Sequence, residues 1–539
     1  MTDFNDNLWI KNVFSTIIKA MNLFKKRSLF LFASFVAGFS IMTIEFTATR
    51  TIIPYVGASV YTWTSVIGVI LLGLAIGSLV GGYIIDKYKR ETTLSLFLFL
   101  SSFLVAFVPF FANKTPFLVS LDLSVLNTIL LISLILFFAP AFFLGLLYPA
   151  ILKLYSKDIE NIGKQYGFVS VFFTLGNILG TFSTGFYLTG KIGSSNTFFL
   201  VSSILFLLAV LFLFLGGSRL KYIVFVLIAM ALLFLMFYIF DKIKNEGKNV
   251  VFSKETNYYK IRVVDIDNFL NFSNSRILFL DSDSHSVENK NGEDLPIYTN
   301  IYPVFTVFNK NIKDIFTIGG GSYSIAKRFS EFYPESKVSV SEIDPEVTKT
   351  AENYFNLKQY PINTIFEDGR VYLQKNEKKY DLIFGDAYNS FITVPWHLMT
   401  FEFNELVKSR LEKDGVYAVN FISTLKDEND FFKSMLTTFK KTFDNFYIFV
   451  YGETEENPQN IILVGVNSDK TMGYDELLKE VGKVKNGEFL SQRIIPNNSL
   501  KNLSNTLVLR DDFSPVEFLM LPLVDQYLKY NTKFFYALF

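Results

Sequence analysis

The chain has 539 residues, with 51 Lys and Arg against 50 Asp and Glu, a formal net charge of +1. A nucleic-acid partner would normally bring a strong basic excess, so this balance argues against one. Cysteine is absent and only two histidines occur, which excludes disulfides, thiolate metal sites and cysteine nucleophiles, argues against a histidine cluster, and leads us to expect no bound metal.

Long apolar runs fill residues 28–241, and runs of roughly 17–25 apolar residues are typical of membrane-spanning helices. The stretch 1–27 ahead of them contains an amphipathic segment, Leu8–Phe24, that suits a helix lying on the membrane surface. We therefore predict a multi-pass protein of the cell membrane, in contact with the lipid bilayer. About seven spans are expected, at about 29–49, 60–84, 93–112, 124–152, 166–189, 196–216 and 221–240.

Three features of this membrane half have both a structural and a functional interpretation. Gly73, Gly77 and Gly81 recur every four residues, which favours close packing of two helices. Glu45 could form a site within the membrane, although near a helix end an acidic residue more often pairs or reaches towards water. The segment Gly77–Arg90 resembles the glycine–Asp–basic loop of major-facilitator transporters, and it could equally be an ordinary charge anchor.

After Asp241 a charged linker leads into short strands, and 242–310 is interpreted as a linker plus a small antiparallel β domain, with strands at Lys260–Asp265 and Arg276–Asp281. From 311 to 539 short apolar runs alternate with helical segments, the pattern of a Rossmann-like α/β domain with a parallel sheet. Its first strand, Asp314–Ile318, runs into glycines, and a helix follows from about Tyr323.

Glycines and carboxylates follow four successive strands of this half. Gly319, Gly320 and Gly321 follow the first strand, and Glu342 follows the second about twenty residues on, where an acidic side chain can accept both ribose hydroxyls. Asp368 and Gly369 follow the third strand, placed to meet an adenine edge, and Asp386 follows the fourth, Tyr380–Phe384. Each carboxylate alone could be a helix cap. Together, at the carboxyl ends of parallel strands, they predict one pocket for a nucleoside-bearing cofactor.

The motifs IGGGSYS, SEIDPEV, EDGRVYL and FGDAYN resemble the spermidine synthase family of polyamine aminopropyltransferases, which share the fold of class I AdoMet-dependent methyltransferases. With its apolar first half, the whole chain is similar to membrane-fused spermidine-synthase-like proteins. The resemblance implies a transferase of spermidine and polyamine biosynthesis. It would move an aminopropyl group from decarboxylated S-adenosylmethionine to a putrescine-like amine and release methylthioadenosine. The family commonly forms dimers or tetramers, and homo-oligomerisation of this chain stays open.

Carried over residue by residue, the resemblance assigns cofactor roles to the motif positions. Asp386 stands at the aspartate that accepts the proton from the amine. The cofactor-binding positions are Gly319, Gly320, Gly321 and Ser322 at the nucleoside and amino-acid end, Glu342 at the ribose, Asp368 and Gly369 at the adenine, and Tyr259 in place of a glutamine that contacts the nucleoside.

The acceptor side departs from the family pattern. Ser322 replaces an aspartate that binds the amine of the aminopropyl group, and Asn389 replaces one that holds a polyamine ammonium. Tyr298 is kept, while Thr299 and Asn300 replace His or Gln followed by Glu. Each lost charge-assisted hydrogen bond is worth roughly 1.5–3 kcal/mol, so the identity of the acceptor amine stays open.

Two alternatives remain beside aminopropyl transfer. The first is a methyltransferase that uses AdoMet itself, because Ser322 could accommodate a cofactor that keeps its carboxylate. The second is a transporter or sensor, in which a degenerate synthase-like domain regulates the helices. His397 is interpreted as a polar helix-start residue rather than a catalyst, and Arg510–Glu517 as a site-closing loop.

Lys and Arg gather in alternate short loops, such as Lys25–Arg27 and Lys87–Arg90, which predicts a cytoplasmic amino terminus. Seven crossings would then put the carboxyl half outside the cell, away from a cytosolic cofactor. We expect this half in the cytoplasm, so the helix count needs revision. The segments to recount are 8–24 and 124–152, the latter interrupted by Pro140 and Pro149.

Overall fold

The computed structural model describes the chain from residue 6 to residue 526, apart from short gaps. Of residues 6–25, 159, 268–269 and 272–273 it describes the backbone only. The gaps are 113–114, 116–117, 119–122, 157–158, 217–234, 236–248, 270–271, 282, 291–296, 388–393, 427–428, 453 and 497–505. The chain divides into a membrane unit, essentially residues 1–245, and a second unit that holds residues 246–539 and two short linking segments.

Within the described residues the membrane unit contains six helical stretches long and apolar enough to cross a membrane. They correspond to the first six predicted spans, and the seventh, 221–240, lies outside the described residues except for Leu235. The elements are α1 (Asp6–Val56), α2 (Val60–Lys87), α3 (Glu91–Ala112), α5 (Val125–Gly145), α6 (Leu147–Tyr155), η1 (Ile159–Asn161), α7 (Ile162–Ser183), the π-helical η2 (Thr184–Leu188), α8 (Thr189–Ile192) and α9 (Ser194–Leu215).

Two details differ from the expected helices. The segment 8–24 is not a separate helix, because α1 runs without a break from Asp6 to Val56. The predicted span 124–152 is interrupted between α5 and α6, at Leu146, while Pro140 lies inside α5 and Pro149 in the first turn of α6. Proline is tolerated in a first turn, where its missing N–H would have no intrahelical partner.

The predicted glycine repeat of α2 packs as expected. Gly73, Gly77 and Gly81 are all buried. A Cβ on Gly77 would overlap the carbonyl oxygen of Phe142, and one on Gly73 would lie 2.8 Å from the Ala141 Cβ. The repeat therefore permits the close approach of α2 to α5, which is a packing role.

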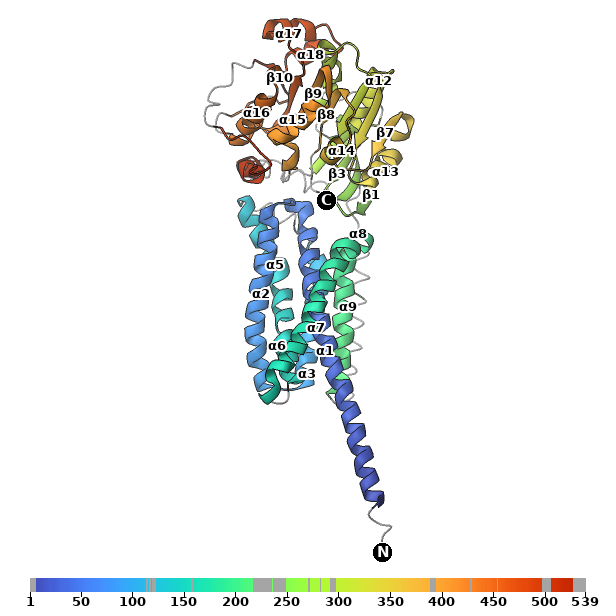
Figure 1. Ribbon diagram of the computed structural model, residues 1–539, viewed down its shortest axis with the longest axis vertical. Helices are drawn as coiled ribbons and strands as arrows, with labels where there is room; N and C mark the ends of the chain where they lie inside the picture. Colours follow the sequence, from blue (N-terminus) through green and yellow to red (C-terminus); the bar gives the residue numbers. More distant parts are fainter. Residues whose placement is uncertain are drawn as a thin grey trace. The chain divides into compact units, whose positions relative to one another are not determined.

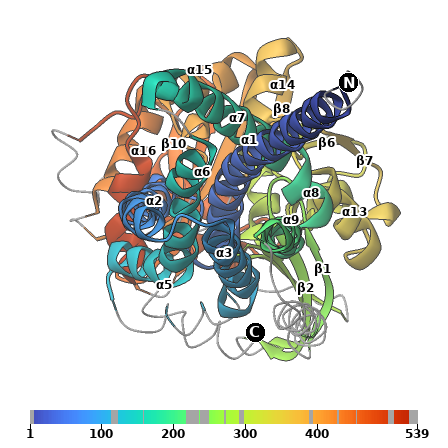
Figure 2. The same cartoon turned by 90° about the horizontal axis from the view of Figure 1, so that it is seen from below.

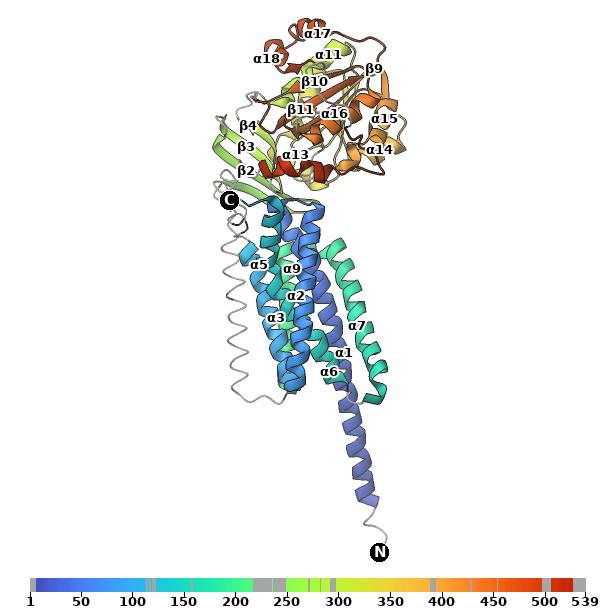
Figure 3. The ribbon, with the colours of Figure 1, turned by 90° about the vertical axis from the view of Figure 1, so that its left-hand side faces the viewer.

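The second unit begins with the small antiparallel sheet that the sequence predicts. Its strands are β1 (Val250–Glu255), β2 (Lys260–Phe269), β3 (Phe272–Leu280) and β4 (Asp283–Asn289), in the order β1-β2-β3-β4. Ile261, Val263 and Leu278 pack with Val347 and Phe355, at and just beyond α13 (Pro345–Tyr354). The small sheet therefore lies against the main α/β domain (Figure 3).

The main sheet has eight strands in the order β12-β10-β11-β9-β8-β5-β6-β7. Figure 1 labels β10, β9, β8 and β7 of this sheet. The strands β7, β6, β5, β8 and β9 pair in parallel, and β11, β10 and β12 continue the sheet in antiparallel pairs. Their bounds are β5 (Asp314–Ile318), β6 (Lys337–Ser341), β7 (Ile362–Ile365), β8 (Tyr380–Gly385), β9 (Leu411–Ser423), β10 (Phe446–Val450), β11 (Gln459–Val466) and β12 (Ile494–Ile495). The Rossmann-like fold class is confirmed.

The strand order reverses between β5 and β8, since β6 and β7 extend the sheet one way and β8 and β9 the other. In open α/β sheets, ligands bind beyond the carboxyl ends of the strands at such a switch point. The remaining elements are η3 (Tyr298–Val304), α11 (Phe305–Phe308), α12 (Ser324–Phe332), η4 (Leu357–Gln359), α14 (Gly369–Lys375), η5 (Trp396–Leu398), α15 (Phe401–Ser409), α16 (Asp430–Thr442), α17 (Tyr474–Val481) and α18 (Gly487–Ser491).

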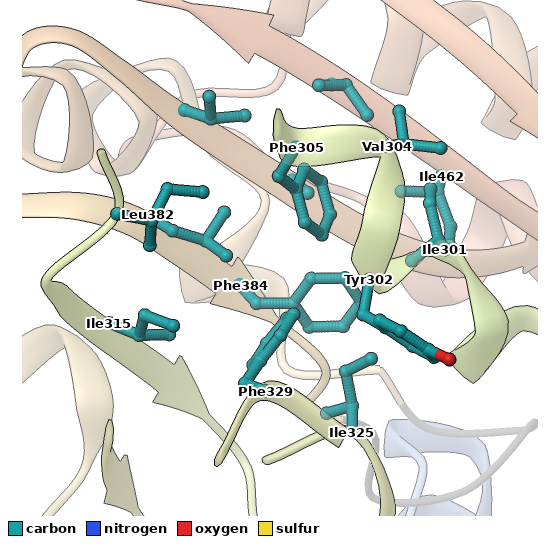
Figure 4. Packing of buried hydrophobic residues seen from close by; sticks show 14 of the residues in the cluster. Ile301, Tyr302, Val304, Phe305, Ile315, Ile325, Phe329, Leu382, Phe384 and Ile462 are labelled. Atoms are coloured by element: carbon teal, nitrogen blue, oxygen red, sulfur yellow. The ribbon is translucent and has the colours of Figure 1, made fainter. Parts of the chain in front are cut away.

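A cluster of buried aromatic and aliphatic side chains fixes α12 on one face of the sheet (Figure 4). The ring of Phe329 from α12 lies 5.9 Å from the ring of Phe305 and 5.8 Å from that of Phe384 in β8. All three side chains are fully buried. This packing sets the position of the α12 amino terminus, and with it the glycine turn that joins β5 to α12.

Candidate functional site

The glycine turn after β5 joins the ends of three strands. Gly319 has φ +94°, and a Cβ there would lie 2.5 Å from the carbonyl oxygen of Asp386. Its N–H donates to the Ser341 carbonyl at 2.9 Å, and the Asp386 N–H donates to the Ile318 carbonyl at 2.8 Å. Only glycine combines this conformation with this contact, so the turn brings the ends of β5, β6 and β8 together.

Glu342 lies directly beneath this turn. Its carboxylate accepts the Gly320 N–H and the Asp344 N–H, both at 2.9 Å, and its side chain is almost completely buried. Burial raises the pKa of Glu342, although the backbone amides of Asp344, Gly320 and Gly321 work in the opposite direction. The predicted neighbours Gly320 and Glu342 are thus in direct contact.

Asp344 and the β1–β2 turn bring Tyr259 to the same place. Asp344 caps α13 by accepting the Glu346 N–H at 3.0 Å, and the Thr256 hydroxyl donates to its other oxygen at 2.5 Å. The pKa of Tyr259 is raised well above its ordinary value, first by burial and then by the negative charges of Glu342 and the neighbouring aspartates. Tyr259 therefore borders the carboxylates, although it belongs to the small sheet, and its predicted contact with a nucleoside stays a prediction.

Asp368 and Gly369 begin α14, also at the carboxyl edge. Asp368 caps the helix by accepting the Val371 N–H at 3.0 Å, and its second oxygen lies 3.1 Å from His397 Nε2. Burial works to raise the pKa of Asp368, but the His397 contact and the backbone amides outweigh it and lower the value. A Cβ on Gly369 would lie 2.5 Å from Ile318 Cγ2, so α14 approaches β5 closely. His397, interpreted as a helix-start residue, is a partner of Asp368.

Asp386 is the carboxylate with the most elaborate support. Its two oxygens accept the Tyr298 hydroxyl and the Asn420 side-chain amide, each at 2.8 Å. The Asn420 oxygen in turn accepts from the Asn460 amide at 3.1 Å. Burial raises the pKa of Asp386 to about 6, even though Asn420 and Tyr298 both stabilise the charged form. An acid whose pKa lies near neutrality is suited to taking up and releasing a proton.

Ser322, predicted to line the cofactor, binds the small sheet through its hydroxyl. Its side chain is fully buried, and its hydroxyl donates to Glu288 Oε1 at 2.9 Å. The same oxygen accepts Lys327 Nζ at 2.6 Å and the Ser324 hydroxyl at 2.9 Å. Ser322 thus anchors the turn to β4, and sequence reasoning had no signal for Glu288 because β4 lies more than thirty residues upstream.

The predicted acceptor residues are only partly brought together. Tyr298 contacts Asp386. Thr299, by contrast, lines a cavity of about 330 Å³ beside β4 and α12. The basic side chains that line this cavity are each paired with an acidic residue: Arg276, Lys290, Lys327 and Arg328. Asn389 lies outside the described residues.

Asn420 and Asn460 are the functional candidates that sequence reasoning missed. Asn420 stands in the apolar strand β9, in the motif LEKDGVYAVNF, and Asn460 stands near the start of β11. A buried amide inside an apolar run is the only signal that could have singled out Asn420, because buried polar groups need partners. The pairing of Ile462 with Asn420 between β11 and β9 puts Asn460 only two residues from that register position.

The segment Arg510–Glu517, predicted to close the site, is tied to α14. Arg370 Nη1 donates to Asp511 Oδ1 at 2.8 Å, and Arg370 Nη2 donates to the other oxygen of Asp511. The Thr400 hydroxyl also donates to Asp511, at 2.7 Å. The carboxylate thus links the carboxyl-terminal segment to the helix that follows Asp368.

Comparison with known proteins gives two family matches. Residues 298–472 match the model described as "Spermine/spermidine synthase domain", and residues 10–181 match the model described as "Major Facilitator Superfamily". The two matches fall on the second unit and on the membrane unit respectively.

Individual relatives agree with the first match. A polyamine aminopropyltransferase of Vibrio vulnificus is 35% identical over 147 residues, 26% of this chain and 48% of the relative. A probable polyamine aminopropyl transferase of Bifidobacterium longum is 31% identical over 138 residues, 25% of this chain and 30% of the relative. The chain therefore spans about half the length, or less, of these curated relatives. The crystal structure of spermidine synthase from Thermotoga maritima aligns with 48% of this chain and 89% of its own, at 19% identity and a TM-score of 0.38.

The Asp511 contacts predict a local loosening when the carboxylate is neutralised. Asp511→Asn should speed amide hydrogen exchange at 509–516 and in the first turn of α14 by up to about fivefold, the effect of an exposed ion pair. Asp512→Asn is the matched control, because Asp512 is also exposed and should leave exchange unchanged. Equal exchange in both variants, measured by mass spectrometry on the full chain, would show that the Arg370 contact does not hold the segment.

Proposed function

We propose that this chain, a membrane-fused spermidine synthase-like protein, transfers an aminopropyl group from decarboxylated S-adenosylmethionine to a small primary amine. The observation that carries the proposal is Asp386, a carboxylate with its pKa raised to about 6 at the strand switch point. The glycine turn adjoins it, and Glu342 and Asp368 follow other strands of the same parallel sheet. The family match to residues 298–472 and the aminopropyltransferase relatives support the same reaction.

The glycine turn supports binding of the sulfonium co-substrate. A Cβ at Gly320 would lie 3.0 Å from Glu342 Oε2, so a side chain at this position would crowd the carboxylate assigned to the ribose. Asp368, whose pKa is lowered by His397, would face the adenine as a charged acceptor. Tyr259 would close the pocket from the small sheet, beside Glu342.

The chemical step requires an unprotonated amine. In solution a primary amine is an ammonium at neutral pH and has no free electron pair. The Asp386 carboxylate would take one proton from the bound ammonium. The freed nitrogen pair then forms a bond to the methylene next to the sulfonium, and the carbon–sulfur bond breaks with its electron pair going to sulfur. Methylthioadenosine leaves uncharged, and the positive charge of the sulfonium passes to the nitrogen of the product, which becomes a secondary ammonium.

Three side chains would position Asp386 for this step. Tyr298 and Asn420 each donate to one carboxylate oxygen, and Asn460 fixes the Asn420 amide so that its NH₂ group points to Asp386. Each carboxylate oxygen keeps a lone pair for the substrate ammonium. The acceptor is proposed as a putrescine-like amine, because Asp386 is a carboxylate that can bind a cation as well as accept its proton.

The test of the function is a product assay on the purified full chain with decarboxylated AdoMet and putrescine. Asp386→Asn should lower the rate by roughly 10²–10⁴-fold, the usual contribution of a positioned base, while methylthioadenosine binding is retained. Asp444→Asn is the control, an exposed aspartate outside the site. Incorporation of labelled methyl from AdoMet, with no aminopropyl product, would overturn the proposal in favour of methyl transfer.

A second prediction concerns pH. The base works only when deprotonated, so kcat/KM should fall tenfold per unit below about pH 6, the pKa of Asp386. Asn420→Ala removes a donor that stabilises the charged form and should move this limb to higher pH by about one unit. Asn460→Ala, which acts through Asn420, should move it less. A limb that stays in place in the Asn420 variant would contradict the assignment of Asp386 as the base.

The synthase half is further proposed to face the cytoplasm, where its nucleoside co-substrate is made. The basic loops around Lys89 support a cytoplasmic amino terminus. An even number of crossings, such as the six helices found among the described residues, would return the chain to the same side. The chain has no cysteine, so a single introduced cysteine is the only thiol that the reagent can label. In whole cells Lys413→Cys and Lys89→Cys should resist a membrane-impermeant maleimide until lysis, whereas Lys191→Cys should react from outside. Labelling of Lys413→Cys in intact cells would contradict the cytoplasmic placement.

A further inference from the structure

Among the described residues, seven side-chain oxygens of the membrane unit are buried and lack a hydrogen-bond partner. They are Ser40 Oγ, Thr43 Oγ1 and Glu45 Oε2 on α1, Thr115 Oγ1, Ser156 Oγ, Asn177 Oδ1 on α7, and Thr184 Oγ1 at the junction of α7 with the π segment η2. Thr184 is completely buried. In a bilayer an unsatisfied polar group costs several kcal/mol, so such oxygens call for a partner.

The helix α7 lies beside α1 (Figure 2). The two helices run in parallel: Ser34 donates to the Val169 carbonyl at 2.8 Å, and a Cβ on Gly180 would lie 2.6 Å from the Phe39 carbonyl oxygen. We call this surface, from Ser34 and Val169 onward, the α1–α7 seam. A Cβ on Gly38 would lie 2.9 Å from Asn177 Oδ1, so Gly38 leaves room for that amide oxygen.

One heptad further along both helices, the same pairing recurs with different side chains. Seven residues are close to two helical turns, so a residue and its seventh successor share a helix face. Seven residues after Gly38, α1 carries Glu45, and seven residues after Asn177, α7 carries Thr184. The carboxylate and the hydroxyl are therefore at the same level of the α1–α7 seam, two turns beyond Asn177.

The Thr184 hydroxyl is buried without the hydrogen bond that a helical threonine usually makes, as are the hydroxyls of Ser40 and Thr43 on α1. Buried Ser and Thr side chains in helices commonly donate to the carbonyl four residues earlier, as Thr47 does to Thr43 at 2.6 Å and Thr181 does to Asn177 at 2.9 Å. Thr184 does not, and its own carbonyl accepts the Thr189 hydroxyl at 3.0 Å. The π segment Thr184–Leu188 begins at this residue, and such segments are frequent at functional sites.

We propose that Glu45 and Thr184 form a site for one monovalent cation in the membrane unit. Carboxylate and hydroxyl oxygens are ligands of hard cations and of ammonium groups. One carboxylate balances a single positive charge in a low-dielectric setting, where an uncompensated charge is costly. Both a sodium ion and a protonated alkylamine have this chemistry. The site is independent of the Asp386 pocket and of the proposed reaction.

The test is equilibrium binding to the full chain in lipid nanodiscs, with ²²Na⁺ and ¹⁴C-methylammonium as separate probes at constant ionic strength. About one Glu45-dependent cation per chain is expected with at least one probe, and the probe that binds identifies the source. Glu45→Gln should reduce this binding at least tenfold, and Thr184→Val should weaken it severalfold. Glu91→Gln is the control, because Glu91 is paired with Lys26 at 2.6 Å and should bind as the parent does.

Folding of the variants is checked by their thermal unfolding midpoints without added cation. Glu45→Asp, which keeps the charge on a shorter side chain, should retain weakened binding. This variant shows whether the loss of binding in Glu45→Gln comes from the missing charge and not from misfolding. Absence of saturable binding of both probes to the parent chain would overturn the proposal. Binding that is equal in the parent, Glu45→Gln and Thr184→Val would overturn it as well.

Discussion

The close contact between Gly319 and the Asp386 carbonyl is the constraint on which the site depends. It occurs because β5 and β8 are neighbours at the point where the strand order reverses, and because glycine permits φ +94° there. A larger residue would push the two strand ends apart. Gly320 would then move away from Glu342, and Asp386 away from Tyr298 and Asn420.

In the second unit, burial, backbone amides and side-chain partners give the carboxylates different pKa values. Glu342 and Asp386 are buried, and burial raises the pKa of both. Asp368, with His397 beside it, has a lowered pKa. Three acids at one sheet edge therefore have pKa values shifted in different directions for local reasons. In the proposed reaction, that separation would let Asp386 act as a base while Asp368 remains a charged acceptor.

The departures from the family pattern have a structural context. Ser322 stands where the family pattern has an aspartate. The serine has a structural role of its own, because its hydroxyl donates to Glu288 of the small sheet. The small sheet thus contributes Glu288 and Ser286 to the glycine turn and Tyr259 to the neighbourhood of Glu342. The small sheet therefore does more than cover the main domain, because it also fixes the glycine turn between β5 and α12.

The sequence by itself determined the two-part organisation, six of the helices, the small sheet and the parallel strands. Periodicity and apolar runs are local properties, and so is the sequence spacing of Gly319, Glu342, Asp368 and Asp386. Only the tertiary structure decided three sets of contacts. His397 contacts Asp368, Asn420 donates to Asp386 and is itself held by Asn460, and Ser322 donates to Glu288. These contacts join residues far apart in the chain, and strand order and register, which no local pattern encodes, bring them together.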